Sequence, residues 1–470
     1  LTTFAWIPLI VWCALAGVSA RASAVAIAMS FLAGEPFFAA VGALLFAVAR
    51  RRGVRDLIDV ALTSFAVSSI QLLPFLSMVL SSDRAHGGVT RAQMFQDSMP
   101  LRDWLRMAIP PNLGANPFDP RLGQHFIPIV YVGVLTVVFA MIGVVIGRRR
   151  ALGWIALVIL CVLIGAGSHF GPGAEVMARL PLTLFRYPAR VVPLAVLAIC
   201  ALAAIGCDRV IRGRWQFAIA LVMFIDVALQ LQPVLITAKF DPHRVPYPQS
   251  IGRDAKILRI DMLRHFDRDG WISGYLNLYD RRFDVWTAAP IVSQRYSMLF
   301  QSILARRDLA GIDALSAGYI LAPGPLAAFE PVAAVRGAVV HRNRGTFPLA
   351  YFRDDITHRI AHVMSLAFTP SSVFIDVDAP ADGDVIVTQQ AAPGWLVTVD
   401  GKTANQHESS LFRAVHVARG RHAIKWTYRP VPLLIGAILT FGGLVRLLFS
   451  SWFVKRGERI KFLRASRENA

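Results

Sequence analysis

Residues 185–206 read FRYPARVVPLAVLAICALAAIG, a short basic turn followed by a long apolar segment. The apolar part runs into a basic segment at 208–214. Basic clusters mark the cytoplasmic ends of membrane helices. Arg186 and Arg190 therefore lie at the opposite, outer end of this helix, where topology does not explain their charge. Two guanidiniums beside a proline-stiffened turn suit an anionic ligand such as a lipid phosphate.

Long apolar blocks recur along the chain. Of its 470 residues, 55% are hydrophobic and 17% are charged, which places it in the membrane class. The net charge is +19, but most of the excess lies in short segments that flank the apolar blocks. These segments are Arg21, 50–56, 148–150, 208–214 and 455–468. Their distribution indicates positive-inside topology and argues against nucleic acid as a partner.

The apolar blocks predict membrane segments. They span 3–20, 22–34, 36–49, 57–80, 127–147, 151–167, 189–206, 217–237 and 431–450. The second and third are shorter than the roughly 20 residues needed to cross a bilayer. They form either a broken or re-entrant pair around Gly34-Glu35-Pro36 or one long kinked helix. If Arg50–Arg52 lie on the cytoplasmic side of the membrane, the later basic clusters lie on that side too. Loops 81–126 and 168–188 then lie on the outer side.

The predicted architecture is a multi-pass α-helical membrane protein with an extracytoplasmic α/β and β-sandwich domain before the last helix. The expected parts are a membrane domain at 1–237, a soluble domain at 238–430, a final helix at 431–450 and a basic cytoplasmic tail at 451–470. A proline-rich linker at 241–248 opens the soluble domain. Alternating residues at 370–430 predict sandwich strands at 372–378, 385–388, 395–399, 412–417 and 423–428. Asp400-Gly401 predicts a hairpin turn.

Two explanations of Arg186 and Arg190 stay open. The pair either snorkels to water and neutralises carboxylates such as Glu175, or binds an anionic lipid or sugar phosphate. Glu35 lies between Gly34 and Pro36 at the outer end of the two short segments. It either faces a cavity beside a site or simply reaches the outer interface.

Loop 81–126 carries two further candidate carboxylates, Asp97 and Asp103. Leu101, Trp104 and Leu105 share one helical face with Asp103 mostly opposite, a pattern that predicts an interfacial amphipathic helix. Its charged residues either anchor the helix at the interface or activate an acceptor hydroxyl. The catalytic residue therefore stays unassigned, with Glu35, Asp97 and Asp103 as candidates.

The sequence indicates no metal site. His358 and His362 have the spacing of a zinc-binding helix, but no glutamate follows the first histidine as in a metalloprotease. No cofactor is expected, and although a divalent cation is possible, no pattern indicates one. All four cysteines lie in or at the ends of apolar segments, so we expect small buried side chains rather than a disulfide framework.

Several segments together resemble the YfhO family of bacterial multi-pass membrane proteins, in the GT-C glycosyltransferase superfamily. Residues 185–190 resemble its Phe-Arg-x-Pro-Ala-Arg signature, and 32–36 look like its Gly-His-Pro element with Glu35 in place of histidine. Gln71–Pro74 and Tyr131–Gly133 occupy matching places. The most similar part is the family's terminal β-module, at 393–402, 412–415 and 420–422.

The resemblance implies a GT-C enzyme fold in a bacterial cytoplasmic (inner) membrane. Such enzymes transfer a sugar from a polyprenyl-phosphate donor to a cell-envelope glycan or lipid on the outer face. An acidic residue serves as general base, and cations such as Arg186 and Arg190 would stabilise the donor phosphate. The implied partners are membrane lipids, the lipid-linked sugar and its acceptor.

The resemblance also concerns the start of the chain. GT-C enzymes carry their key carboxylate in the first outer loop, and family members are longer at the N-terminus. We therefore expect this chain to lack an N-terminal part that supplies this carboxylate.

Two alternatives to an enzyme remain. One is a non-catalytic GT-C-like scaffold that binds lipid-linked glycan or a partner protein. The other is a lipid or glycan transporter, which should show charges near the bilayer midplane and related halves. Asp226 is the main mid-helix carboxylate, and no internal repeat is visible, so the transporter is the weaker alternative.

The predicted topology places 238–430 outside the cytoplasm. A cysteine introduced within 400–410 should therefore react with a membrane-impermeant thiol reagent in intact cells. Protection of that cysteine until the cells are lysed would overturn the topology.

Overall fold

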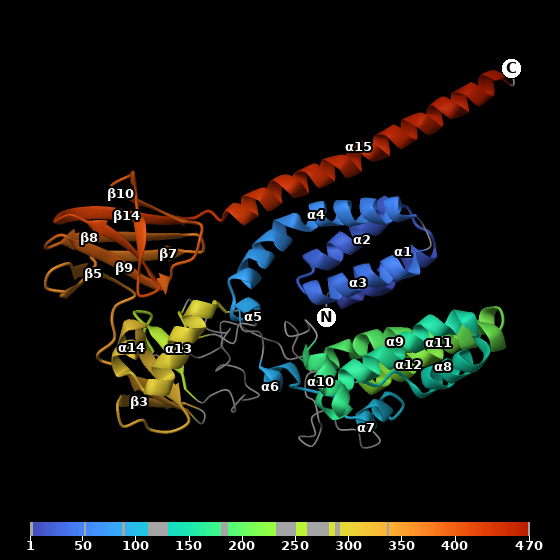
Figure 1. Cartoon of the computed structure of the whole chain (residues 1–470), viewed down its shortest axis with the longest axis horizontal. Helices are drawn as coiled ribbons and strands as arrows, with labels where there is room; N and C mark the ends of the chain where they lie inside the picture. The colour runs from blue at the N-terminus through green and yellow to red at the C-terminus, as the bar shows by residue number, and fades with distance from the viewer. Residues whose placement is uncertain are drawn as a thin grey trace. The chain divides into compact units, whose positions relative to one another are not determined.

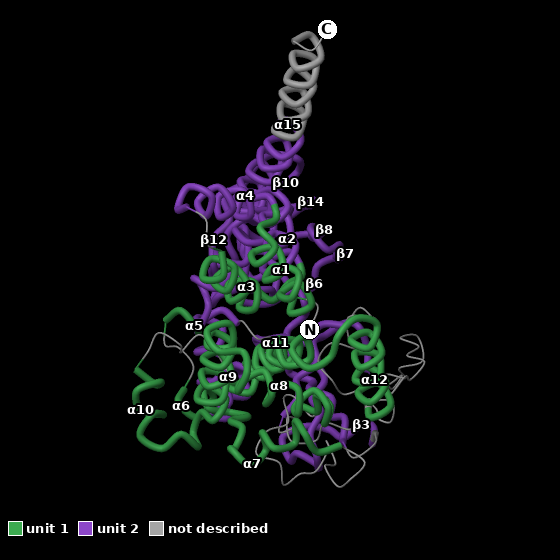
Figure 2. Tube along the Cα trace, turned by 90° about the vertical axis from the view of Figure 1, so that its right-hand side faces the viewer, with its two compact units in different colours: residues 1–18, 33–51, 84–238 green, residues 19–32, 52–83, 239–470 purple. Residues whose placement is uncertain are grey.

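The computed structural model describes residues 3–50, 53–86, 90–110, 130–179, 187–231, 251–260, 282–286, 292–335 and 338–468, and only the backbone of Val335 and of 450–468. Arg186 and the linker at 241–248 lie outside these residues. The fold is mixed, with apolar helices and, in the C-terminal part, β-sheets (Figure 1). The chain forms two compact units (Figure 2). Unit 1 comprises 1–18, 33–51 and 84–238, and unit 2 comprises 19–32, 52–83 and 239–470.

Each expected apolar segment contains a helix within the described residues. These helices are η1 Phe4–Trp6 with α1 Ile7–Leu15, α2 Ala20–Leu32, α3 Pro36–Ala49, α4 Val54–Leu80, α8 Val134–Ile146, α9 Arg149–Ala166, α11 Val192–Val210, α12 Arg214–Leu231 and α15 Val431–Glu468. The short helices between them are α5 Asp83–His86, α6 Arg91–Met94, α7 Leu101–Trp104, η2 Leu105–Met107, η4 Gly167–Phe170, α10 Pro172–Arg179 and η5 Pro188–Val191. Helices α2 and α3 are separate, so the alternative of one long kinked helix is wrong.

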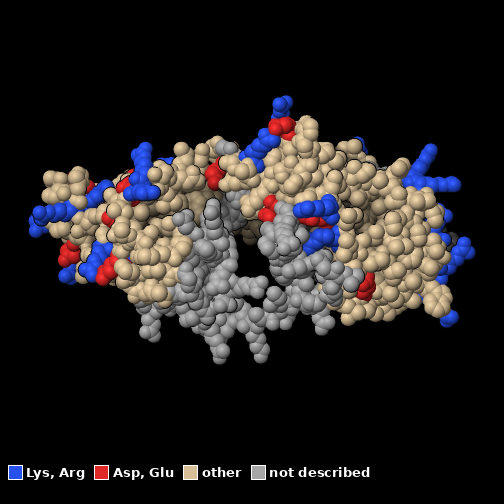
Figure 3. Space-filling view, turned by 90° about the horizontal axis from the view of Figure 1, so that it is seen from below, with Lys and Arg blue, Asp and Glu red and all other residues tan. Residues whose placement is uncertain are grey.

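Four helical spans in the described part are long and apolar enough to cross a membrane. They are Val54–Leu80, Arg149–Phe170, Pro188–Val210 and Val431–Phe449. Only 11% of the last span is buried within the protein. An apolar surface left this open needs apolar surroundings, which supports membrane association. On the face shown in Figure 3, Lys and Arg gather at the outer edge of the helical part, beside a broad uncharged surface.

In unit 1, helices α8 and α11 pack backbone to backbone. A Cβ atom at Gly143 would lie 2.0 Å from the Leu202 carbonyl oxygen, and one at Gly206 would lie 2.0 Å from that of Phe139. Only glycine permits this approach, which resembles the small-residue contacts of membrane helix pairs. Helix α9 packs against α11, and α1 packs against α3.

Gly143→Ala should therefore separate α8 from α11. Overpacking of this kind costs about 1–3 kcal/mol, so the apparent melting temperature of the detergent-purified protein should fall. Gly153→Ala on α9 is the matched control, because its added Cβ would have no atom within 4 Å. Equal melting temperatures for the two variants would show that the glycine contact does not matter.

In unit 2, helices α4 and α15 form an antiparallel pair. Asp59, near the start of α4, pairs with Arg446, whereas Gly436, near the start of α15, lies against Ser69. A Cβ atom at Gly436 would lie 2.5 Å from the Ser69 carbonyl oxygen. The Thr440 hydroxyl bonds the Ala66 carbonyl at 3.2 Å. Helix α2 packs against α4.

The end of α4 and the start of α15 both join the soluble part of unit 2. After α4, the Asp83 amide donates to the Val292 carbonyl at 3.0 Å, just before α13 (Gln294–Arg306). At α15, the Arg429 amide donates to the Gly394 carbonyl at 2.6 Å. The antiparallel pair therefore presents both of these ends on one side.

The first soluble module is an α/β layer. Its strands β1 Lys256–Arg259, β2 Ala317–Ala322, β3 Glu330–Val335 and β4 Ala338–Arg342 have the order β1-β2-β4-β3. Strand β1 runs parallel to β2, and β4 runs antiparallel to β2 and β3. Helices α13 and α14 (Leu309–Ala314) share one core with this sheet, which includes Leu258, Phe300 and Ile320.

The second soluble module is a sandwich of two five-stranded sheets, ordered β11-β10-β14-β8-β7 and β12-β13-β9-β5-β6. The five strands expected from the sequence are β8 Ser372–Ala379, β9 Gly383–Gln390, β10 Trp395–Val399, β13 Phe412–Val417 and β14 Gly420–Tyr428. The others are β5 Ala350–Asp354, β6 Ile360–His362, β7 Ser365–Thr369, β11 Lys402–Ala404 and β12 Gln406–Ser409. The sandwich thus begins at residue 350, earlier than the 370 expected.

The Asp400-Gly401 pair forms the hairpin turn that the sequence predicts. Asp400 and Gly401 both have positive φ, +50° and +77°, and turn the chain from β10 into β11.

The buried Arg413 lies between the sheets, with its guanidinium carbon 3.6 Å from the centre of the Trp395 ring. Burial lowers the pKa of Arg413 to about 10. Within the motif segments, Val397 and Val415 belong to the sandwich core, and Trp395 and Val399 pack against it.

The outer face of the β12-β13-β9-β5-β6 sheet is half covered. Tyr351, Ile386 and Ala414 on this face share a core with the α/β module. Next to them the buried Lys256 ammonium donates to the Thr388 carbonyl and lies 5.4 Å from the Phe412 ring centre. Burial lowers the pKa of Lys256 from 10.5 to about 7.

This shift makes stability depend on pH. Between about pH 7 and 10.5 the unfolded chain holds a proton on Lys256 that the folded chain releases, so stability rises with pH across this window. Lys256→Met should abolish that part of the rise. The apparent melting temperature of wild type, relative to the variant, should therefore increase between about pH 7 and about pH 10. A difference that is constant with pH would mean that Lys256 titrates normally.

Candidate functional site

A strained turn holds Arg190 in η5, the short 3-10 helix directly before α11. Tyr187 has the left-handed conformation, φ +64°, which costs an L-residue about 1–2 kcal/mol. Pro188 follows it and disfavours the right-handed helical conformation at the residue before it. The Arg190 amide donates to the Tyr187 carbonyl at 2.9 Å, and the guanidinium carbon lies 5.4 Å from the centre of the Tyr187 ring. The turn therefore fixes where the Arg190 side chain points.

Arg190 forms an ion pair with Glu35, another candidate residue. Its Nη1 lies 3.3 Å from Glu35 Oε1, although 155 residues separate the two. The side chains are 20% and 38% exposed, so the pair is partly open to the surroundings. Glu35 follows Gly34, whose φ of +100° ends the connection from α2, and its amide donates to the Thr3 hydroxyl at 2.9 Å. Both ends of the pair are thus held by backbone contacts.

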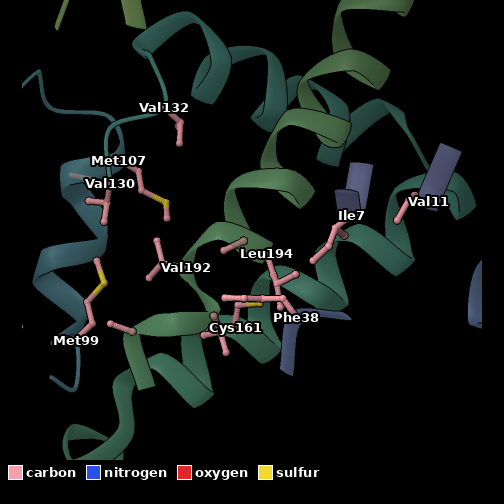
Figure 4. Packing of buried hydrophobic residues seen from close by; sticks show 13 residues of the cluster. Ile7, Val11, Phe38, Met99, Met107, Val130, Val132, Cys161, Val192 and Leu194 are labelled. Atoms are coloured by element: carbon pink, nitrogen blue, oxygen red, sulfur yellow. The ribbon is translucent and has the colours of Figure 1, made fainter. Parts of the chain in front are cut away.

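Figure 4 shows the packed apolar core of this unit, which contains the residues on either side of Arg190. Ala189 and Val191, on either side of Arg190, belong to the same buried cluster as Phe38 and Ile7 from α3 and α1. The cluster also takes in Met99, Met107, Val130, Val132, Cys161, Val192 and Leu194. Because protein cores are close-packed, this contact leaves the start of α11 little freedom to move away from the start of α3.

The sequence offered neutralisation of a carboxylate such as Glu175 as one explanation of the arginine pair. Glu175 forms its ion pair with Arg91, at 2.5 Å. The carboxylate at Arg190 is Glu35. Neutralisation of a carboxylate therefore does occur at Arg190, with a residue from a distant segment.

Asp103 is buried, on the side of α7 opposite its two leucines. Leu101 and Leu105 are 64% and 67% exposed, whereas Asp103 is only 5% exposed. Met99 before α7 and Met107 in η2 are also buried and belong to the apolar core. The exposed leucines lie opposite Asp103, so the interfacial helix stays a prediction, although α7 itself is only the single turn Leu101–Trp104.

The environment of Asp103 is unusual for a carboxylate. Its Oδ1 lies 3.8 Å from Arg102 Nε, and its buried Oδ2 has no hydrogen-bond partner among the described residues. The next residue, Trp104, packs on the core that contains Ala189 and Val191. A buried carboxylate oxygen without a partner is costly, which keeps Asp103 a candidate functional residue.

Asp97 follows α6 in a left-handed conformation, φ +57°. The segment after it is tied to the end of α9: the Met99 amide donates to the Gly165 carbonyl at 2.8 Å, and the Ser168 amide donates to the Ser98 hydroxyl at 3.1 Å. Asp97 thus lies at an anchored turn, and nothing in the described geometry assigns it a chemical role.

Two other sequence features have clear structural outcomes. Asp226 on α12 accepts a hydrogen bond from the Tyr131 hydroxyl at 2.9 Å, so this mid-helix carboxylate has a partner within unit 1. His358 lies in a turn with φ +54°, and His362 ends β6, so the two histidines do not share a helix. The pair therefore does not form a zinc-binding helix, although its spacing in sequence matches one.

Comparison with known proteins found no matching family model, no matching curated protein and no matching solved structure. The site must therefore be judged on its own chemistry. Its described part contains a guanidinium, a carboxylate and an aromatic ring held in fixed relation. Sequence reasoning found Arg190 and Glu35 but missed their contact, and it missed the supports from Thr3 and the Tyr187 ring, because these depend on tertiary structure.

Proposed function

We propose that the chain is a membrane glycosyltransferase of the GT-C type, which transfers a sugar from a polyprenyl-phosphate donor to a glycan or lipid of the cell envelope. The observation that carries the proposal is the partly open Arg190–Glu35 ion pair at the start of an apolar helix. A guanidinium suits the lipid phosphate, and a carboxylate suits the acceptor hydroxyl. The resemblance of the 185–190 motif to the YfhO signature supports the same function.

In this mechanism the acceptor oxygen attacks the anomeric carbon, and the bond from that carbon to the phosphate oxygen breaks. The carboxylate takes the proton of the acceptor hydroxyl, while Arg190, with Arg186, stabilises the negative charge left on the lipid phosphate. Glu35 is one candidate for the base. Asp103 is the other, because its buried Oδ2 lacks a partner among the described residues.

The resting ion pair is compatible with phosphate binding. A guanidinium binds carboxylate and phosphate with the same planar fork, so an arriving phosphate can replace Glu35 on Arg190. The exchange would release the Glu35 carboxylate beside the donor. Before the donor binds, the ion pair with Arg190 would keep the Glu35 carboxylate away from other groups.

A non-catalytic scaffold is the second candidate function. The same ion pair fits a scaffold, because Glu35 could serve only to neutralise the charge of Arg190. Such a protein would bind the lipid-linked sugar but would not transfer it. The transporter has less support, because Asp226 is hydrogen-bonded to Tyr131.

Arg190→Ala should weaken binding of a polyprenyl phosphate to the full-length protein in nanodiscs. Loss of a charge-assisted hydrogen-bonding group corresponds to about a 10- to 100-fold rise in Kd. Arg190→Lys should restore part of the affinity, since it keeps the charge but loses the fork. Arg186→Ala should add to the loss. Neutral polyprenol, which lacks the phosphate, should bind all variants alike.

Arg91→Ala is the matched control, since it removes an Arg–Glu ion pair of the same unit outside the proposed site. If it weakens binding as much as Arg190→Ala does, phosphate recognition by Arg190 is refuted. Glu35→Gln and Asp103→Asn separate the two functions. The variant that removes the base should lose sugar transfer but keep donor binding, whereas a wild-type protein that binds donor without transfer supports the scaffold.

A further inference from the structure

The uncovered half of the β12-β13-β9-β5-β6 sheet carries a cluster of metal-ligating side chains. Asp384 on β9 and His416 on β13 are register partners, and Asp355 directly follows β5. Val385, Val387, Val415 and Val417 face the sandwich core. Because side chains alternate along a strand, Asp384 and His416 face outward. Three neighbouring chain segments thus bring two carboxylates and an imidazole together.

The separations fit one cation. The potential ligand atoms of Asp355, Asp384 and His416 all lie within 4.8 Å of one another. His416 Nδ1 lies 3.6 Å from Asp355 Oδ2 and 3.7 Å from Asp384 Oδ1. Ligands bound at about 2.0–2.2 Å around tetrahedral Zn²⁺ lie roughly 3.3 Å apart. The two separations from His416 are within a few tenths of an ångström of that value, and the two carboxylates lie no more than 4.8 Å apart.

A second layer already orients the central carboxylate. Asp384 is buried, and its Oδ2 accepts from Arg353 Nη2 at 3.3 Å and lies 3.0 Å from His407 Nε2. Its Oδ1 is the oxygen nearer His416. Groups that bond the outer oxygen of a ligating carboxylate are typical of metal sites, because they fix the direction of the inner one.

From this geometry we infer a binding site for a Zn²⁺-type divalent cation, with Asp355 Oδ2, Asp384 Oδ1 and His416 Nδ1 as ligands. The imidazole favours zinc and related transition metals over Mg²⁺ and Ca²⁺, which take oxygen ligands. Asp355 and His416 are 47% and 55% exposed, so the outer side of the cation would take water or a ligand oxygen. The site does not depend on the proposed glycosyl transfer.

The test uses the full-length detergent-purified protein with an affinity tag that lacks histidine. After treatment with a chelator and reloading with Zn²⁺, wild type should retain a single Zn²⁺ per chain through gel filtration. Asp355→Asn with His416→Gln should reduce Zn²⁺ affinity at least tenfold, since two ligands are lost. Both residues are exposed, so this variant should keep the metal-free melting temperature of wild type. His407→Gln should lower affinity about tenfold as a second-layer change.

His422→Gln is the matched control. His422 Nδ1 lies 2.8 Å from Asp400 Oδ2 on the other sheet, but in the described residues only the Asp355, Asp384 and His416 group joins three such side chains. This variant should bind Zn²⁺ as wild type does. Wild type that retains no Zn²⁺, or a double variant that retains as much as wild type, would overturn the site. The cluster would then be no more than a histidine side chain beside two aspartates.

Discussion

Close contact between helix backbones is the constraint on which the helical part depends. In apolar surroundings helices gain little from burying leucine against leucine, so association relies on tight packing and on hydrogen bonds. Glycines supply the contact in both units. Gly143 and Gly206 bring α8 onto α11, and Gly436 brings α15 onto α4. In each pair an added methyl group would meet a carbonyl oxygen of the partner helix, so the spacing of the helices is set by the absence of side chains.

This packing positions the candidate site. Helix α11 is held by α8 through its glycine contact and by α9 on another side, so its first turn has a defined place. Arg190 lies in η5, directly before that turn, and the core beneath it includes residues of α1 and α3. Glu35 precedes α3 and meets Arg190 there. An ion pair that joins two helix starts over a rigid core keeps its geometry, which is what recognition of a small anion requires.

Local patterns were sufficient for the helices and for much of the sandwich. Apolar blocks predicted the helices, and period-two alternation with Asp400-Gly401 predicted strands and a hairpin, since both depend on neighbours in sequence. The burial of Asp103 was missed because it depends on tertiary contacts, as does that of Met99 and Met107. The Arg190–Glu35 contact and the Asp355, Asp384 and His416 cluster were missed for the same reason. Strand register and helix packing, which no spacing along the chain reveals, bring these residues together.

The junction between β14 and α15 has a mechanical consequence. Only Arg429 and Pro430 separate the strand from the helix, and the Arg429 amide is bonded to Gly394. A Cβ atom at Gly394 would lie 2.8 Å from the Pro430 backbone, so the turn before β10 presses directly on this junction. The two-residue connection between β14 and α15 is too short to absorb a pull or a twist. A load applied to the sandwich would reach α15 as a tilt or rotation of the whole helix, and through the α4 contact it would reach a second helix as well.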